Sequence, residues 1–248
     1  VFFAKDTGQP APAALSATNQ TVVLRVVLNN PPTTIDPGVI TTDEDVNKVI
    51  SLSGTDLDVI TNEQKTLTIV VTSLPTNGRL QHNSAILTAE NTALTVKTFD
   101  QTSTTSTVTY LPNANYNGQD SFGFYVVDVI GAKSSPRTVS IILNPVNDAP
   151  TTKAVTATGN EDELFLITGF SAEDIDGDAI TYVIEAAPAK GALYLDGTLV
   201  NSYPRNISSS SISLLGFKGN LNENGSPYTT FNFHVTDGYL NSNTFVGS

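Results

Sequence analysis

Asp174, Asp176 and Asp178 occupy alternate positions of the segment Asp174-Ile175-Asp176-Gly177-Asp178. Like charges about 4 Å apart repel by roughly 1 kcal/mol in water and by about 4 kcal/mol near a protein surface. Three such carboxylates therefore favour a bound cation. Hard oxygen ligands with no neighbouring His or Cys suit calcium, which takes about 6–8 oxygens. A solvated, aspartate-rich turn is the alternative interpretation.

An EF-hand does not explain this segment. Glu185 falls at the last position of a calcium loop of that kind, but the glycine stands at Gly177 rather than directly after Asp178. The residues that follow, Ile180-Thr181-Tyr182-Val183-Ile184, form a β-branched and aromatic run that predicts a strand instead of a helix.

The acidic segment belongs to a pattern that occurs twice, with an offset of about 110 to 120 residues, the size of one sandwich domain. Each copy has an apolar strand running into an Asn/Pro linker, an acidic cluster, an aspartate pair and an aromatic strand ending in aspartate. These features are residues 21–33, 43–45, Asp56 with Asp58, and 122–128 in the first set, and 138–150, 161–163, Asp174 with Asp176, and 231–237 in the second. Short strands bounded by turn dipeptides predict an all-β sandwich.

Sandwich geometry predicts that the acidic residues converge. The loop after an early strand, the loop before the last strand and the entering linker lie at one end of an aligned sandwich. We therefore expect oxygen ligands for one metal site from Asn147, Asp148, Asp174, Asp176 and Asp237. The matching earlier set is Asn30, Asp56, Asp58 and Asp128, and it lacks one carboxylate because Asn30 replaces Asp148.

The repeat also predicts the domain organisation. Residues 1–30 are expected to form the closing hairpin of a preceding repeat, 31–148 a complete repeat, and 149–248 a second repeat that lacks the end of its last strand. Both ends would then cut through a repeat, so we expect the native chain to continue in both directions.

Composition excludes several function classes. The net charge is −12, from 24 acidic and 12 basic residues, which disfavours nucleic acid and anionic membrane surfaces as partners. Cysteine is absent, so there are no disulfides and no thiol nucleophile. Nucleotide-binding, zinc-protease and serine-hydrolase motifs are absent too, and the sequence predicts a protein that is not an enzyme. Three sequons, at Asn19, Asn206 and Asn224, would permit N-glycosylation.

The chain resembles the cadherin-like tandem repeats of large extracellular adhesins and surface proteins. The resemblance rests on Pro145-Val146-Asn147-Asp148-Ala149-Pro150, on 172–178 and on the Tyr110–Phe122 stretch. It implies tandem immunoglobulin-like or cadherin-like sandwiches in an elongated array, with calcium between adjacent repeats. It also implies that Glu44 joins the site at Asp148, and Glu161 the next site downstream. The chain departs from the family in two ways: the acidic motif that cadherins carry late in each domain is not visible, and residues 215–225 replace the Tyr-Leu-Pro-Asn stretch. These departures leave one to three ions per junction open.

The function expected on these grounds is that of a calcium-rigidified spacer in an adhesive protein at the cell surface, with neighbouring repeats of the same chain as its first partners. A domain that binds glycan or protein on another surface is one alternative. A lateral building block of a surface filament is another, and a domain attached to a secreted hydrolase is the third.

Overall fold

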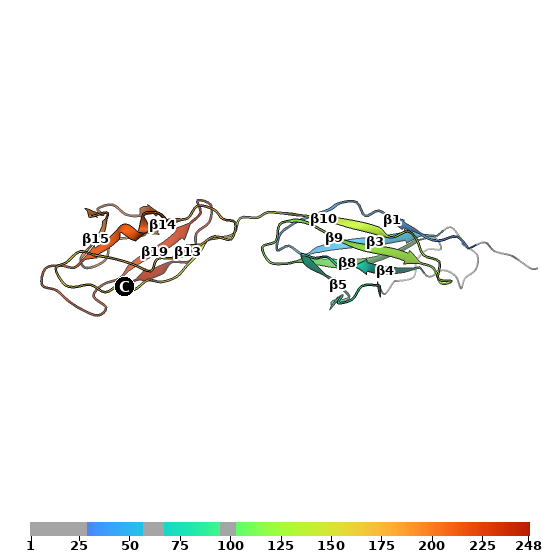
Figure 1. Ribbon diagram of the computed structural model, residues 1–248, viewed down its shortest axis with the longest axis horizontal. Helices are drawn as coiled ribbons and strands as arrows, with labels where there is room; N and C mark the ends of the chain where they lie inside the picture. Colours follow the sequence, from blue (N-terminus) through green and yellow to red (C-terminus); the bar gives the residue numbers. More distant parts are fainter. Residues whose placement is uncertain (1–28, 57–66, 95–102) are drawn as a thin grey trace, which may run out of the picture.

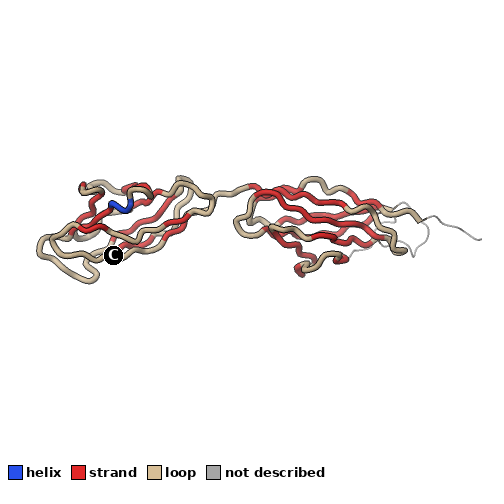
Figure 2. The backbone as a smooth tube through the Cα atoms, viewed as in Figure 1, coloured by secondary structure: helices blue, strands red, loops and turns tan. Residues whose placement is uncertain are grey.

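The computed structural model describes residues 29–56, 67–94 and 103–248 of the chain. Two β-sandwiches follow one another along the long axis of the molecule, joined by a single extended segment (Figures 1 and 2). Within the described residues the only helical element is a 3-10 turn, Ile212–Leu214. The predicted all-β fold of tandem sandwiches in an elongated array is therefore confirmed.

The first sandwich consists of two five-stranded sheets. One sheet has the order β1 (Thr33–Ile35), β3 (Lys48–Thr55), β8 (Ser103–Pro112), β5 (Gly78–His82), β6 (Ala85–Ile86). The other has the order β2 (Ile40–Asp43), β10 (Arg137–Asn144), β9 (Gly118–Val127), β4 (Thr68–Ser73), β7 (Thr92–Ala93). All neighbouring strands are antiparallel except β2 and β10, which are parallel.

The first core is built from strands along which buried and exposed side chains alternate. Along β10, Val139, Ile141 and Leu143 are buried while the residues between them are exposed, because successive side chains point to opposite faces. Tyr110 is also fully buried, and its hydroxyl donates to Asp120 Oδ2 at 2.8 Å. Burial and the carboxylate of Asp120 raise the pKa of the Tyr110 hydroxyl well above its usual range.

The second sandwich has shorter strands. One sheet has the order β12 (Phe165–Leu166), β18 (Leu215–Lys218), β15 (Ala192–Leu195), β16 (Thr198–Leu199). The other has the order β17 (Arg205–Ser208), β14 (Thr181–Ile184), β19 (Phe231–Thr236), β20 (Phe245–Gly247). A third, two-stranded sheet pairs β11 (Thr151–Thr152) with β13 (Ala172–Glu173). Aromatic rings fill the core, with Phe170 packed edge-on against both Tyr182 and Phe233.

The two hydrophobic cores lie on either side of the linker. The first contains buried residues from Ile50 to Leu143, and the second contains buried residues from Val155 to Val235. The boundaries at 30/31 and 148/149 stay predictions, and the expected closing hairpin at 1–30 lies almost entirely outside the described residues. No helix in the described ranges has the length and apolarity that a bilayer crossing requires.

Candidate metal centre at the domain junction

A buried glutamate holds the linker at the point where it leaves the first sandwich. Glu44 directly follows β2 and is only 3% exposed. Its backbone N–H donates to the carbonyl of Asn144 at 3.0 Å, which extends the parallel pairing of β2 with β10. Its Oε1 accepts a 2.6 Å hydrogen bond from the backbone N–H of Val146. Glu44 therefore fixes the first residues of the linker against the sandwich they have just left.

The same linker is held from the other side by two loops of the second sandwich. The backbone N–H of Asp148 donates to Asp176 Oδ2 at 2.7 Å. The side-chain amide of Asn147 donates to Asp237 Oδ2 at 2.8 Å. Asp176 lies in the loop after β13 and Asp237 directly follows β19, so residues from distant parts of the sequence meet here.

The loop after β13 is shaped by Asp174. Its Oδ1 accepts the backbone N–H groups of Asp176 at 3.0 Å and Asp178 at 3.2 Å. Gly177 takes a φ of 80°, a conformation that residues with a β-carbon seldom adopt. The turn thus directs Asp174 and Asp176 towards the linker, and the carboxylate of Asp178 is on an exposed residue.

Three carboxylate oxygens around the linker are buried and have no hydrogen-bond partner. They are Glu44 Oε2, Asp148 Oδ2 and Asp174 Oδ2. A buried charged oxygen that is left unpaired costs more than the roughly 1–3 kcal/mol of a neutral group. Such orphaned atoms call for an explanation, and an unplaced ion is one that fits anionic oxygen.

Negative charge from both sandwiches acts on Asp148. Burial raises the pKa of its carboxyl, and repulsion from Asp176, Asp45, Glu44 and Asp174 raises that pKa further. Glu44 and Asp45 belong to the first sandwich and Asp174 and Asp176 to the second. Sequence reasoning did not assign Asp45 to the site, although it stands in the acidic cluster 43–45.

The donor set fits calcium chemically but is not already gathered around one point. Every side chain at the junction offers oxygen, which is the ligand atom that calcium prefers. Yet no three or more His, Cys, Asp or Glu side chains within the described ranges are arranged to hold a metal ion. Several carboxylate oxygens are instead engaged by backbone N–H groups, so holding an ion would require side chains to turn towards it.

Asp237 is held in its ionised form. Its Oδ1 accepts the backbone N–H groups of Tyr239 at 2.6 Å and Leu240 at 2.7 Å. The hydrogen bond from Asn147, followed by the one from the backbone of Leu240, lowers the pKa of Asp237. The late loop thus supplies a stable negative charge beside the linker.

The earlier set of predicted ligands is only partly described. Asp128 Oδ2 accepts from the amide of Asn29 at 2.9 Å, the same arrangement as Asp237 with Asn147. Burial raises the pKa of Asp128, but the hydrogen bonds from Asn29 and from backbone N–H groups outweigh it and leave the pKa lowered. Asp56 directly follows β3, and Asn30 lies in the linker beside Asn29. Asp58 lies outside the described residues.

The structure brings together the five residues predicted at the Asp148 junction, whereas their role as metal ligands stays a prediction. Of the three sequons, Asn206 and Asn224 are exposed, and Asn19 lies outside the described residues. Their glycosylation also stays a prediction.

The sequence analysis missed Asn29 as a residue of the earlier set, because its neighbour Asn30 aligns with Asp148. The sequence could have identified it, since Asn29 occupies the position of Asn147 in the linker pattern.

The curated proteins that are similar to this chain include integrin beta-like proteins. No family model matches the chain. Integrin beta-like protein C of Dictyostelium discoideum is 28% identical over 174 residues, covering 65% of this chain and 8% of the relative. Integrin beta-like protein B of the same organism is 25% identical over 241 residues, covering 89% of this chain and 12% of the relative. The chain therefore spans only a small part of these curated relatives.

Two solved structures are also similar to this chain. Drosophila N-cadherin EC1-3 has 14% sequence identity and a TM-score of 0.31, over 88% of this chain and 67% of that one. The D00-D0 domain of intimin has 13% identity and a TM-score of 0.32, over 88% of this chain and 99% of that one. The more specific assignment to the repeats with the Val-Asn-Asp-Ala-Pro linker stays a prediction.

The expectation that the protein is not an enzyme is wrong as a general exclusion. An endo-fucoidan hydrolase from glycoside hydrolase family 107 is among the similar structures, with 17% identity and a TM-score of 0.33, over 92% of this chain and 30% of that one. The absence of catalytic motifs had suggested the exclusion, but a sandwich module can lie within an enzyme chain. At this level of similarity the match transfers no activity to this chain.

Proposed function

We propose that this chain is a spacer segment of an adhesive extracellular protein, and that calcium at the junction between its two sandwiches stiffens it. The adhesive, extracellular setting is supported by the relatives named integrin beta-like proteins. The calcium site is supported by one observation above all. Three buried carboxylate oxygens, from Glu44, Asp148 and Asp174, lack partners at the point where the two sandwiches meet.

The residues of the junction would act as a clamp on the linker. Glu44 and Asp45 approach it from the first sandwich, and Asp174, Asp176 and Asp237 from the second. When bound, calcium would supply positive charge that offsets their mutual repulsion. The backbone bonds from Val146 to Glu44 and from Asp148 to Asp176 already fix the linker to both sandwiches. Offsetting the repulsion would favour the geometry in which both bonds persist.

Titration calorimetry with calcium tests the site itself. Extracellular modules bind calcium with dissociation constants of about 10⁻⁴–10⁻³ M. Asp174→Asn keeps the side-chain shape but removes a charge, and we expect it to weaken calcium binding at least about tenfold. Mutating even a residue that contacts only the ligands of a metal has an effect of this size. Asp196→Asn is the matched control, because Asp196 is exposed in a turn of the second sandwich with a left-handed φ of 48° that asparagine tolerates.

Small-angle X-ray scattering tests the mechanical consequence. With calcium we expect a longer and more sharply defined maximum dimension than with a chelator, and Asp174→Asn should reduce the difference. A maximum dimension that stays the same in both conditions would remove the spacer mechanism, even if an ion binds.

A further inference from the structure

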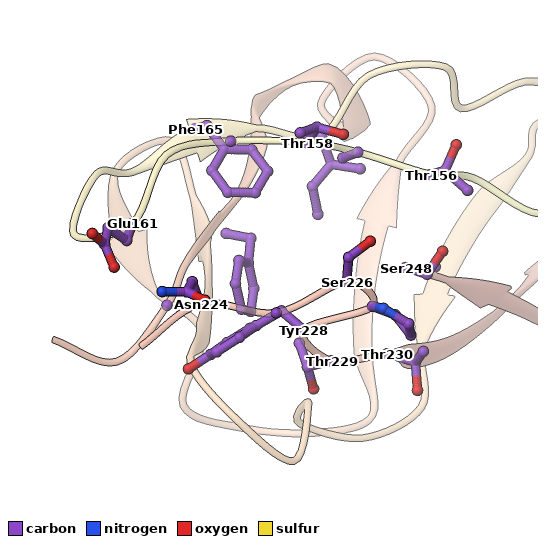
Figure 3. A pocket seen from close by; sticks show the side chains of 18 of the residues that line it. Thr156, Thr158, Glu161, Phe165, Asn224, Ser226, Tyr228, Thr229, Thr230 and Ser248 are labelled. Atoms are coloured by element: carbon purple, nitrogen blue, oxygen red, sulfur yellow. The ribbon is translucent and has the colours of Figure 1, made fainter. Parts of the chain in front are cut away.

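The sheet β12-β18-β15-β16 of the second sandwich has one inward and one outward face. On the inward face, Leu193 and Phe217 belong to the second core and Phe165 packs against it. Figure 3 shows the ring of Phe165 directed into the space of about 590 Å³ between residues 156–161 and the loop 223–231. Successive side chains of a strand point to opposite faces, so the residues that alternate with these three form the outward face.

A row of apolar residues crosses the outward face. The strand register sets four residues side by side across the four strands: Leu166, Gly216, Tyr194 and Leu199. A β-carbon added at Gly216 would lie 3.2 Å from Leu164 Cδ1 and 3.6 Å from Leu166 Cδ2, so both leucines lean over the glycine. Leu164, Leu166 and Leu199 are 44%, 54% and 50% exposed. These five residues form a continuous surface, called here the outer patch.

The first sandwich has polar residues at two of the equivalent positions. Aligning the pair β15–β18 with the pair β5–β8 on their buried residues places Gln81 at the position of Tyr194 and Thr109 at that of Gly216. The sandwich fold therefore does not require this face to be apolar. An exposed apolar area of a few hundred Å² on a soluble protein commonly marks an interaction site.

The sheet that carries the outer patch has no negative charge. Its four strands contain no Asp or Glu, and their only charged residue is Lys218 at the end of β18. The whole chain carries a net charge of −12, so two copies repel each other, and least where both present a surface without carboxylates. Flat sheet faces also pack well on one another, about 10 Å apart with their strands nearly aligned. The outer patch of a second copy meets both conditions.

The size of the sheet face sets the strength of such a contact. Four strands spaced about 4.8 Å apart, each with about four residues at this face, cover roughly 300 Å². A stable dimer needs about 800 Å² from each partner. The contact is therefore weak between free molecules. It becomes populated where copies are held side by side, because tethered molecules reach effective concentrations of about 1 mM.

We propose that the outer patch is a self-association surface, at which the second sandwiches of two neighbouring copies pack face to face. Both copies use the same patch, so the contact is isologous and each residue of the patch contributes twice. This contact joins copies laterally, whereas the candidate metal centre acts along the chain and shares no residue with the patch.

Sedimentation equilibrium of the full chain in chelator tests the proposal without involving the calcium site. At about 0.5 mM protein we expect the average mass to exceed that of the monomer, as for a contact of the weak class. We expect the association to strengthen as NaCl rises from about 0.05 M to about 0.5 M, because salt screens the repulsion between acidic copies.

A double variant with Leu166→Thr and Leu199→Thr tests the position of the contact. It should raise the dissociation constant at least about tenfold, because each copy loses two half-exposed apolar side chains. Val246→Thr is the matched control, since Val246 is 45% exposed and lies on β20 in the other sheet. Thermal unfolding followed by circular dichroism checks that both variants are folded.

Crosslinking locates the contact by a second measurement. The chain has no cysteine, so Leu199→Cys and Val246→Cys each carry a single thiol. With a short bifunctional maleimide we expect Leu199→Cys to form covalent dimers at least about fivefold faster than Val246→Cys, because thiols beside a contact have a high effective concentration.

The outcomes decide the proposal as follows. Association that strengthens with salt, is weakened in the double variant and persists in Val246→Thr supports it. A mass that stays monomeric at the highest protein and salt concentrations overturns it, as does association that weakens with salt or that the double variant leaves unchanged. Equal crosslinking of the two cysteine variants also overturns it, because the copies then meet through another surface.

Discussion

Replacing Asp148 by Asn should stabilise the calcium-free protein and reduce the stabilisation that calcium brings. In the calcium-free protein, burial and the carboxylates of Asp176, Asp45, Glu44 and Asp174 raise the pKa of Asp148. A carboxyl whose pKa is raised on folding destabilises the folded state once it is ionised, above its unfolded-state pKa. Asp148→Asn removes that charge and keeps the backbone N–H that donates to Asp176. We therefore expect the calcium-free variant to be more stable than the wild type at pH 7.

Calcium should stabilise the wild type more than the Asp148→Asn variant. At 1 mM calcium, a site with a dissociation constant of about 10⁻⁴ M stabilises the folded state by roughly 1.4 kcal/mol. If the lost carboxylate weakens binding about tenfold, the variant gains only about 0.4 kcal/mol. The difference of about 1 kcal/mol corresponds to roughly 4–8 °C in the melting temperature of a domain of about 100 residues.

Thermal unfolding followed by circular dichroism, with a chelator and with 1 mM calcium, measures both effects. Magnesium at the same concentration controls for ionic strength, because magnesium demands a stricter octahedral geometry. Asp196→Asn controls for the loss of one negative charge elsewhere. The reasoning is refuted if wild type and Asp148→Asn gain equally from calcium, or if the variant is the less stable of the two in chelator.

Three further changes test other parts of the structure. Glu44→Ala should destabilise the protein by about 1–3 kcal/mol in urea unfolding, since the N–H of Val146 loses its acceptor, and Glu44→Gln should recover most of that loss. Tyr110→Phe should cost about 0.5–1.5 kcal/mol in the same assay, because it removes the hydroxyl bonded to Asp120 from a fully buried site. Asp128 has a lowered pKa, so its contribution is complete above the unfolded value of about 3.8 and is lost as the pH falls through the folded value. The urea midpoint of the first sandwich should accordingly fall below about pH 4, and Asp128→Asn should flatten that dependence.

The fold could be predicted because alternation and repetition are both visible in the sequence. The run Thr138–Leu143 has an apolar residue at every second position, and these are the buried residues of β10. The convergence of Asn147 with Asp237 was equally accessible. It follows from chain topology, since the linker and the late loop lie at one end of a sandwich.

Other features depend on geometry that residue types do not encode. The stretch 215–225 differs in sequence from the Tyr110–Phe122 region. Yet Asn222 makes the same backbone contact to Asp162 that Asn115 makes to Asp45. The turn depends on one aspartate acceptor and one left-handed asparagine, so most of the intervening residues are free to change. Likewise, only coordinates reveal which carboxylate oxygens lack partners.

Glu44 connects the fold of the first sandwich to the candidate metal centre. Its backbone N–H bonds Asn144 at the end of β10, its Oε1 accepts the N–H of Val146 from the linker, and the residue is 3% exposed. An ionised carboxylate in that position is costly unless its second oxygen is also satisfied, and Glu44 Oε2 is one of the unpartnered atoms. The contacts that attach the linker to the first sandwich therefore also leave an anionic oxygen that a cation would satisfy.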